Sequence, residues 1–164
     1  YLVFVDYYST GELTCFLFSE TKKDASDFSP TSYIIEPDFI GNKATRLGLS
    51  KDSYASALKE RELYFPTALE FNNIGVAIPH ADSGHINNEF ISLITLDEPI
   101  EFSAMEDSDR RIKVSIVFVL GLLKANDQLA TLQAIMQLLQ EENTLKYLMD
   151  ANNVDDVMNS LNGI

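Results

Sequence analysis

The chain has 164 residues, which fits a single domain with a hydrophobic core, and its 12 basic and 25 acidic residues give a net charge of −13. Such an acidic surface argues against binding to nucleic acid or insertion into an anionic membrane, because both need clustered lysine and arginine, and it suits partners with basic faces. The single cysteine, Cys15, excludes an internal disulfide and a cysteine-rich zinc site. Neither a signal peptide nor an apolar stretch of about 20 residues is visible, so we expect a cytoplasmic protein.

The first 31 residues differ from the rest of the chain. Residues 1–5 and 13–18 are apolar runs rich in aromatic residues, and turn-forming residues separate them, which favours a β-hairpin. Residues 20–30 are polar and rich in Ser, Asp and Lys, as is typical of a linker. We therefore expect an N-terminal extension over residues 1–31 and one domain over residues 32–164.

Two helices are predicted next along the chain. The first runs over residues 38–47 and ends near Gly48. The second runs over residues 51–64, with Ser50 as its N-cap and Pro66 just beyond its end.

The second of these helices carries an arginine on its apolar face. Tyr54, Ala57 and Leu58 form a stripe at helical spacing, and Arg61 falls on the same stripe. An arginine that faces the body of a protein needs a carboxylate or an anion beside it. We weigh two interpretations equally: an ion pair with an acidic neighbour, and a binding site for an anion.

Strands dominate the middle of the chain. Short apolar runs predict strands over residues 75–79, 90–96 and 100–102, with a charged loop over 105–111. Residues 112–120 begin with alternation and become continuously apolar, which is typical of a central strand buried on both faces.

The last third of the chain is predicted to be helical. Asn126 or Asp127 can cap a first helix, Asn143 a second that runs through residue 149, and Asn153 a third. The first of these helices presents an apolar face made by Leu129, Leu132, Ile135, Met136 and Leu139. Strands mixed with helices, one strand being buried on both faces, predict an α/β sandwich.

Both histidines of the chain lie in one short segment, Gly75 to His85. His80 follows an apolar strand and Pro79, which fixes the backbone just before it, and strand ends are where sites gather in α/β folds. A neutral imidazole can take and pass on a phosphoryl group, a proton or a metal. His85 can return to the same pocket through the turn at Gly84, so one imidazole could be a nucleophile and the other a donor to phosphate oxygens.

Two other groups could support phosphoryl transfer at His80. Arg61 could supply positive charge, and the helix that starts near Asp127 could offer its N-terminal amides to an anion.

Two competing interpretations of the histidine segment stay open at this point. His80, Asp82 and His85 are ligand types that suit zinc, and a small metal-dependent hydrolase would use them, although their spacing matches no established motif and no further strong ligand is evident. Alternatively, both are ordinary histidines of a polar loop, which is what composition alone favours.

Several features in a fixed order resemble a known family. The segment Arg61-Glu62-Leu63-Tyr64-Phe65-Pro66-Thr67 is followed by Gly75-Val76-Ala77-Ile78-Pro79-His80, then by the apolar strand 114–120 and a helix that opens Asn126-Asp127-Gln128-Leu129. This order, over roughly residues 32–162, resembles the enzyme IIA component of the bacterial phosphoenolpyruvate-dependent sugar phosphotransferase system (PTS), in its fructose/mannitol superfamily.

The resemblance implies a fold, a function and a set of site residues. The fold is a mixed β-sheet with helices on both faces, a three-layer α/β sandwich. His80 would accept a phosphoryl group, expected on Nε2, from phospho-HPr and pass it to an enzyme IIB during sugar uptake, with Arg61 beside the active site. The protein would be a phosphotransferase without a cofactor or a metal, and it would reach a membrane enzyme IIC only through enzyme IIB.

One position separates branches of the family. Many fructose and mannitol members have a second histidine at the start of the helix where this chain has Gln128. Galactitol-type members resemble this chain more closely, because they have Gln in that segment and a histidine five residues after the phosphorylated one, where His85 stands. The galactitol-like branch is therefore the best match, with His85 stabilising the phosphoryl group and Gln128 contacting it.

A regulatory role is the alternative function. Enzyme IIA-like domains also occur in sugar-responsive transcription regulators, where phosphorylation of the same histidine is a signal. The first residue is Tyr1 rather than Met, and residues 1–31 match nothing in the family, which would fit a segment cut from a longer chain.

Overall fold

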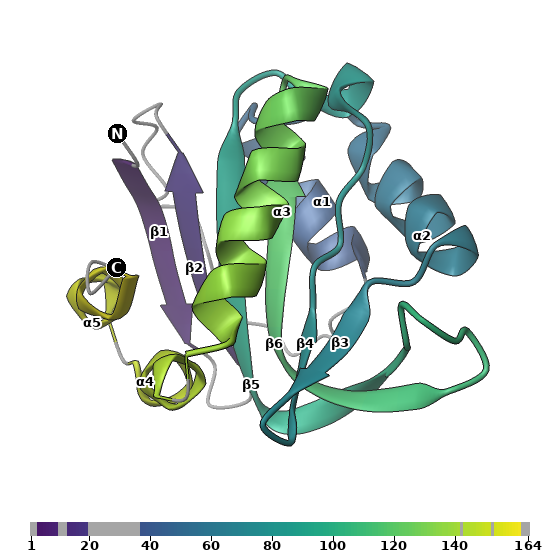
Figure 1. Cartoon of the computed structure of the whole chain (residues 1–164). Coiled ribbons are helices and arrows are strands. Elements are labelled where there is room, and N and C mark those ends of the chain that lie inside the picture. The colour runs from purple at the N-terminus through teal and green to yellow at the C-terminus, as the bar shows by residue number, and fades with distance from the viewer. Residues whose placement is uncertain (1–2, 10–12, 20–36, 142, 152, 162–164) are drawn as a thin grey trace.

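A six-stranded sheet lies at the centre of the protein, and helices cover both of its faces (Figure 1). The structure, a computed structural model, describes residues 3–9, 13–19, 37–141, 143–151 and 153–161. The strand order is β1-β2-β5-β6-β4-β3. The strands are β1 (Val3–Ser9), β2 (Leu13–Ser19), β3 (Ala68–Phe71), β4 (Ile74–Ala77), β5 (Phe90–Ser103) and β6 (Arg111–Gly121). The predicted three-layer α/β sandwich with a mixed sheet is confirmed.

The direction of the strands changes across the sheet. Strands β1, β2, β5 and β6 are successively antiparallel, whereas β4 runs parallel to β6 and β3 closes the far edge antiparallel to β4. The two N-terminal strands pair with each other, and β2 also pairs with β5, so they are part of the one sheet. The predicted linker over residues 20–30 lies outside the described residues.

The hairpin of β3 and β4 was not predicted from the sequence. Its two-residue turn is made by Asn72 and Asn73, whose φ angles are 49° and 65°. Two successive left-handed residues are what a tight hairpin turn needs, and asparagine tolerates that conformation better than most residues. The strand expected over residues 75–79 is β4, and it ends two residues earlier than predicted.

Strand β5 is one long strand where two were predicted. It runs through Glu98 and Pro99, the pair expected to turn the chain, and its register with β6 shifts between Thr95 and Ile100. The proline is accommodated at this irregularity, where the ladder of hydrogen bonds is already interrupted.

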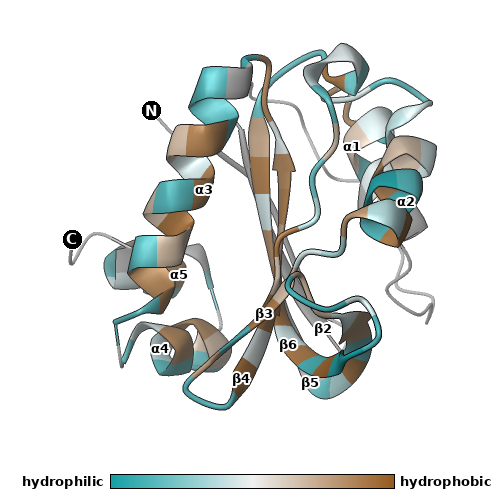
Figure 2. Cartoon of the chain, turned by 45° about the vertical axis from the view of Figure 1, so that its right-hand side comes forward, coloured by the Kyte–Doolittle hydropathy of each residue, from teal (hydrophilic) through white to brown (hydrophobic). Residues whose placement is uncertain are grey.

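The core has two halves, one on each face of the sheet. Side chains of β6 alternate between them: Ile116, Phe118 and Leu120 pack with the C-terminal helices, whereas Val117 and Val119 pack with α1 and α2. This confirms that residues 112–120 form a central strand buried on both faces. Figure 2 shows the apolar sheet between the two layers of helices.

The two helices of the first layer are α1 (Pro37–Arg46) and α2 (Tyr54–Tyr64). The α1 helix is followed by Gly48 with a φ of 70°, as the predicted stop requires. The predicted start of α2 is wrong by three residues. Ser50 does not cap it: Ser50 is buried, its hydroxyl lies 3.1 Å from that of Thr45, and its backbone pairs with Ile86.

The helices of the second layer are α3 (Ala125–Leu139), α4 (Thr144–Asp150) and α5 (Val154–Leu161). Neither Asn126 nor Asp127 caps α3, which begins before them, and Asn143 makes no capping hydrogen bond. Asn153 does cap α5 as predicted, because its side-chain oxygen accepts the N–H of Asp156 at 2.9 Å.

The apolar face of α3 is shorter than predicted. Ile135 and Leu139 are buried as expected, but Leu129 is 59% exposed. None of the helices in the described ranges combines the length and the hydropathy that crossing a bilayer requires.

Candidate functional site

His80 lies just beyond the end of a central parallel strand. After β4 the chain continues beside β6, where the N–H of Leu120 donates to the carbonyl of Pro79 at 3.1 Å and His80 forms a parallel bridge with Leu120. Because β4 and β6 are parallel, His80 is at their shared carboxyl end. This is the edge where parallel strands of α/β folds present their ligand sites.

The ring of His80 is held by the backbone two residues before it, just past the end of β4. Its Nδ1 lies 2.8 Å from the carbonyl oxygen of Ile78. A carbonyl only accepts hydrogen bonds, so Nδ1 carries the proton and a neutral ring has its lone pair on Nε2.

The surroundings of His80 favour this neutral ring. Burial lowers the pKa of His80 from 6.5, and the charge of Arg61 lowers it further, against opposing effects of the Ile78 carbonyl and Asp82. At neutral pH the imidazole is therefore uncharged and nucleophilic at Nε2.

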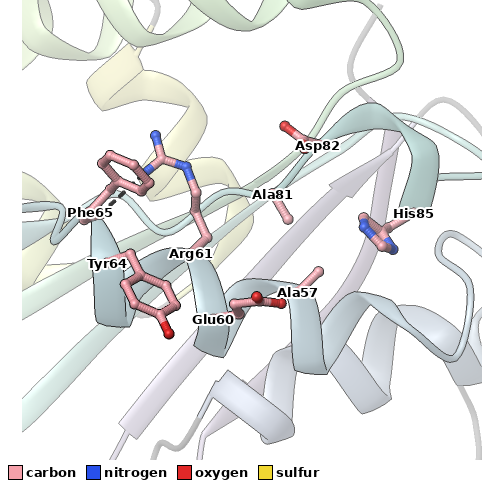
Figure 3. Close-up of a pocket in the computed structure, with 8 residues that line it drawn as sticks. All are labelled: Ala57, Glu60, Arg61, Tyr64, Phe65, Ala81, Asp82 and His85. Carbon is pink, nitrogen blue, oxygen red and sulfur yellow. Dashed lines mark hydrogen bonds between the residues drawn. The ribbon is translucent and has the colours of Figure 1, made fainter.

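A pocket of about 280 Å³ lies beside the segment that follows His80 (Figure 3). One wall is formed by α2 and the residue after it, and the other by the segment that follows His80. The residues that line the pocket are Ala57, Glu60, Arg61, Tyr64, Phe65, Ala81, Asp82 and His85. His80 does not itself line this pocket, but its neighbour Ala81 does, and the charges of Arg61 and Asp82 both act on the imidazole of His80. The structure thus brings Arg61, His85 and the surroundings of His80 together.

Arg61 is half-buried in this pocket and pairs with no carboxylate among the residues that the structure describes. Its guanidinium lies 4.5 Å from the ring centroid of Phe65, and Nη1 donates a hydrogen bond of 3.4 Å to the Phe65 carbonyl (Figure 3). Stacking on an aromatic ring leaves most of the five guanidinium N–H donors for an anion. The described residues thus give no support to the interpretation of Arg61 as an ion pair, and the guanidinium remains available to an anion.

His85 lines the same pocket from a short 3-10 turn, Ser83–His85. Its Nδ1 lies 2.8 Å from the hydroxyl of Ser53, the residue before α2. Lys51 holds the turn through its backbone N–H, 2.9 Å from the carbonyl of His85, and its ammonium, 2.6 Å from the carbonyl of Gly84. The anchoring role of Ser53 could not be inferred from the sequence, since Ser53 was expected inside the helix.

Gln128 connects the start of α3 to the same loop. Its side-chain amide donates a hydrogen bond of 3.3 Å to the carbonyl of Ala81, the residue that follows His80. Gln128 therefore contacts the residue that follows His80, but it does not line the pocket with Arg61 and His85.

A series of hydrogen bonds that the sequence did not predict leads from α2 to the backbone just before His80. The carboxylate of Glu62 accepts the backbone N–H of Thr67 at 2.9 Å and its hydroxyl at 2.8 Å, and the Thr67 hydroxyl in turn accepts the N–H of Ile78 at 3.2 Å. Burial raises the pKa of Glu62 above 4.5, although the bonds from Thr67 and the charge of Arg61 oppose this. Glu62 and Thr67 belong to the segment Arg61–Thr67, and the resemblance of this segment to the family was the sequence feature that could have indicated them.

A metal centre at the histidines is not supported by the described part of the chain. Within it, no three side chains of His, Cys, Asp or Glu are grouped as a metal ion would require, so His80, Asp82 and His85 do not form the ligand set that was considered. The Nδ1 atoms of both histidines are instead engaged by Ile78 and Ser53.

Comparison with known proteins identifies the family. The chain matches the family "Phosphoenolpyruvate-dependent sugar phosphotransferase system, EIIA 2" over residues 37–163. The galactitol-specific EIIA component of the PTS of Escherichia coli K12 is 29% identical over 110 residues, which cover 67% of this chain and 73% of that protein.

Solved structures share the fold at low sequence identity. A Streptococcus mutans protein described as a PTS IIA (PtxA) has a TM-score of 0.64 at 17% identity, over 82% of this chain and 83% of its own. The mannitol enzyme IIA of Escherichia coli, solved in complex with phosphorylated enzyme IIB, has a TM-score of 0.59 at 18% identity, over 83% of this chain and 92% of its own. The family match spans most of the chain, and the chain therefore belongs to the EIIA 2 family of the phosphoenolpyruvate-dependent sugar phosphotransferase system.

Proposed function

We propose that His80 is a phosphoryl carrier, which accepts a phosphoryl group on Nε2 from phospho-HPr and passes it to an enzyme IIB. The observation that carries the proposal is the hydrogen bond of 2.8 Å between Nδ1 of His80 and the Ile78 carbonyl. It leaves the Nε2 lone pair free to attack phosphorus while the bond between phosphorus and the donor breaks and the donor keeps that electron pair. The positive charge that the ring gains is then stabilised at Nδ1 by the same carbonyl.

Arg61 and His85 are proposed to stabilise the phosphoryl group in transfer. Phosphoryl transfer depends mainly on positioning and on groups that neutralise the equatorial oxygens. Arg61 offers guanidinium donors beside an aromatic ring, and His85 offers an imidazole held by Ser53 on the other side of the pocket. We also propose that Gln128 and the first amides of α3 contact the transferred group, because Gln128 already reaches the loop that follows His80.

Exposed apolar side chains beside the pocket support docking of a protein partner. Leu63, Tyr64 and Phe65 at the end of α2 are 74%, 68% and 63% exposed, and Tyr64 and Phe65 also line the pocket. A cluster of exposed aromatic and aliphatic side chains marks a surface that another protein covers. The net charge of −13 suits a donor with a basic face, as proposed for HPr.

The galactitol-like branch is the proposed place of this chain in its family. The galactitol-specific relative supports it, and so does His85, whose place in the pocket suits the role implied for that branch. Under this proposal the protein works in the cytoplasm and takes part in polyol uptake with an enzyme IIB. The regulatory alternative would use the same chemistry at His80, and no feature of the fold favours it.

Intact mass measurement tests the proposal directly. Wild-type protein and His80→Ala are incubated with enzyme I, HPr and phosphoenolpyruvate, and circular dichroism verifies that both are folded. We expect an acid-labile gain of one phosphoryl group in the wild type and none in His80→Ala. A wild-type protein that gains nothing while HPr is phosphorylated would contradict the proposal.

A further inference from the structure

We infer that Glu62 and Thr67 are positioning residues, which hold the backbone of Ile78 and thereby fix the ring of His80 in the form that presents Nε2 to the phosphoryl donor. This inference deepens the proposed function and rests on it for its consequence in transfer. Its structural claim, which concerns the tautomer of His80, stands on hydrogen bonds alone.

The direction of each hydrogen bond in this chain is fixed. The backbone N–H of Thr67 can only donate, and it donates to one oxygen of Glu62 at 2.9 Å. The N–H of Ile78 can also only donate, and it uses the Thr67 hydroxyl oxygen at 3.2 Å. The hydroxyl proton of Thr67 is therefore free for the second oxygen of Glu62, at 2.8 Å.

This series of hydrogen bonds reaches His80 through the backbone of one residue, Ile78. Ile78 is bound at its N–H by Thr67 and uses its carbonyl oxygen to accept Nδ1–H of His80 at 2.8 Å. Because Ile78 lies beyond the last residue of β4, the ladder of the β3–β4 hairpin, which ends at the pair Ala68 and Ala77, does not hold it. The hydroxyl of Thr67 takes the place of a strand partner at this position.

Burial makes these hydrogen bonds effective in holding the backbone of Ile78. Thr67 is 2% exposed and Ile78 is fully buried, so water cannot replace the hydroxyl as a partner for the N–H of Ile78. Without the hydroxyl, the backbone at Ile78 would shift or leave a buried donor unpaired. Either change displaces the carbonyl that orients the imidazole, and small misplacements of reacting groups cost large factors in rate.

The test compares two substitutions at the same position. Thr67→Val removes the hydroxyl at nearly constant volume, whereas Thr67→Ser keeps it, and Glu62→Gln replaces one acceptor oxygen by a donor. Long-range ¹H–¹⁵N spectra of ¹⁵N-histidine-labelled protein report the tautomer of His80, and single-turnover phosphorylation by phospho-HPr reports the rate. Circular dichroism verifies folding, and Glu62→Gln serves if Thr67→Val does not fold.

We expect the wild type and Thr67→Ser to hold His80 with its proton on Nδ1. Thr67→Val and Glu62→Gln are expected to shift protons to Nε2 and to lose at least about tenfold in phosphorylation rate. A Thr67→Val protein with the wild-type tautomer and rate would overturn the inference. If no protein, the wild type included, is phosphorylated, the proposed function fails instead, and the tautomer spectra still decide the role of Glu62 and Thr67.

Discussion

The Nδ1 atom of His80 lies 2.8 Å from the carbonyl oxygen of Ile78, only two residues earlier in the chain. The residue between them is Pro79, whose ring restricts the backbone angle φ. The imidazole proposed to be the nucleophile is thus oriented by the backbone just before it, and no carboxylate of the described residues forms a hydrogen bond with it. This arrangement presents Nε2 while it leaves the ring uncharged.

The pH dependence of His80 follows from its burial. Because burial lowers its pKa from 6.5, the ring stays neutral below the pH at which an exposed histidine becomes half protonated. In an NMR titration we expect the His80 resonances, identified by their loss in His80→Ala, to have a midpoint below 6.5. A midpoint at or above 6.5 would contradict the buried, neutral state.

The same shift affects the stability of the fold. The unfolded chain binds a proton at His80 at a higher pH than the folded chain does, so the free energy of unfolding should decrease as the pH falls from 6.5 through the folded pKa. Urea denaturation of wild type and His80→Gln over this range measures the contribution, and the decrease should be smaller in the variant. Equal decreases in both proteins would assign the effect to other groups.

Arg61 and His85 are expected to matter for transfer and not for folding. Each substitution, Arg61→Ala or His85→Ala, should slow phosphorylation of His80 by about 10²–10³, since each removes a group that stabilises charge in the transition state. Melting temperatures should change little, because both side chains are only half-buried at the pocket wall. Unchanged single-turnover rates in both variants would refute these roles, and Arg61→Lys should recover part of the rate because it keeps the charge.

Gln128 should contribute less than Arg61. Its side-chain amide donates a hydrogen bond of 3.3 Å to the carbonyl of Ala81, and a neutral hydrogen bond is worth about 0.5–1.5 kcal/mol. We therefore expect Gln128→Ala to slow phosphorylation by less than about tenfold in the same assay. A loss as large as that of Arg61→Ala would contradict this ranking and would mean that Gln128 stabilises the transition state as strongly as a charged group does.

Gly75 is required by the close approach of β4 and β6. A Cβ atom there would collide with the backbone carbonyl of Lys113 and lie 2.8 Å from Cγ2 of Ile112. Gly75→Ala should therefore lower the free energy of unfolding by about 1–3 kcal/mol in chemical denaturation.

The control for this prediction is Gly84→Ala. No atom lies within 4 Å of a Cβ at position 84, so this variant should unfold within about 0.5 kcal/mol of the wild type. Equal stability of the two variants would mean that β4 and β6 separate easily at Gly75.

The sequence predicted the sandwich, and it singled out Arg61 and His85, which line one pocket, because both depend on strong local patterns. Residues 112–120 begin with alternation and become continuously apolar, which is typical of a central strand, and the segment ending in Pro79 and His80 marked the end of a neighbouring strand. The apolar spacing of Arg61 also placed it correctly in the pocket wall.

What the sequence did not predict depends on tertiary contacts. Strand β3 is only four residues long and shows no clear alternation, so its pairing with β4 through Asn72 and Asn73 was missed. Leu129 matches the helical period yet is exposed, because periodicity does not tell which residues of a helix are covered by other elements. The link from Glu62 through Thr67 to Ile78 joins two segments that only the β3–β4 hairpin brings together.

The most direct test of the proposed function is to identify the atom that carries the phosphoryl group. ¹⁵N-histidine-labelled protein is phosphorylated through enzyme I and HPr at neutral pH, and its histidine nitrogens are observed by NMR. We predict that Nε2 of His80 becomes phosphorylated while its Nδ1 keeps its proton, and that both ring nitrogens of His85 remain unmodified. A phosphoryl group on Nδ1 of His80, or on His85, would contradict the account.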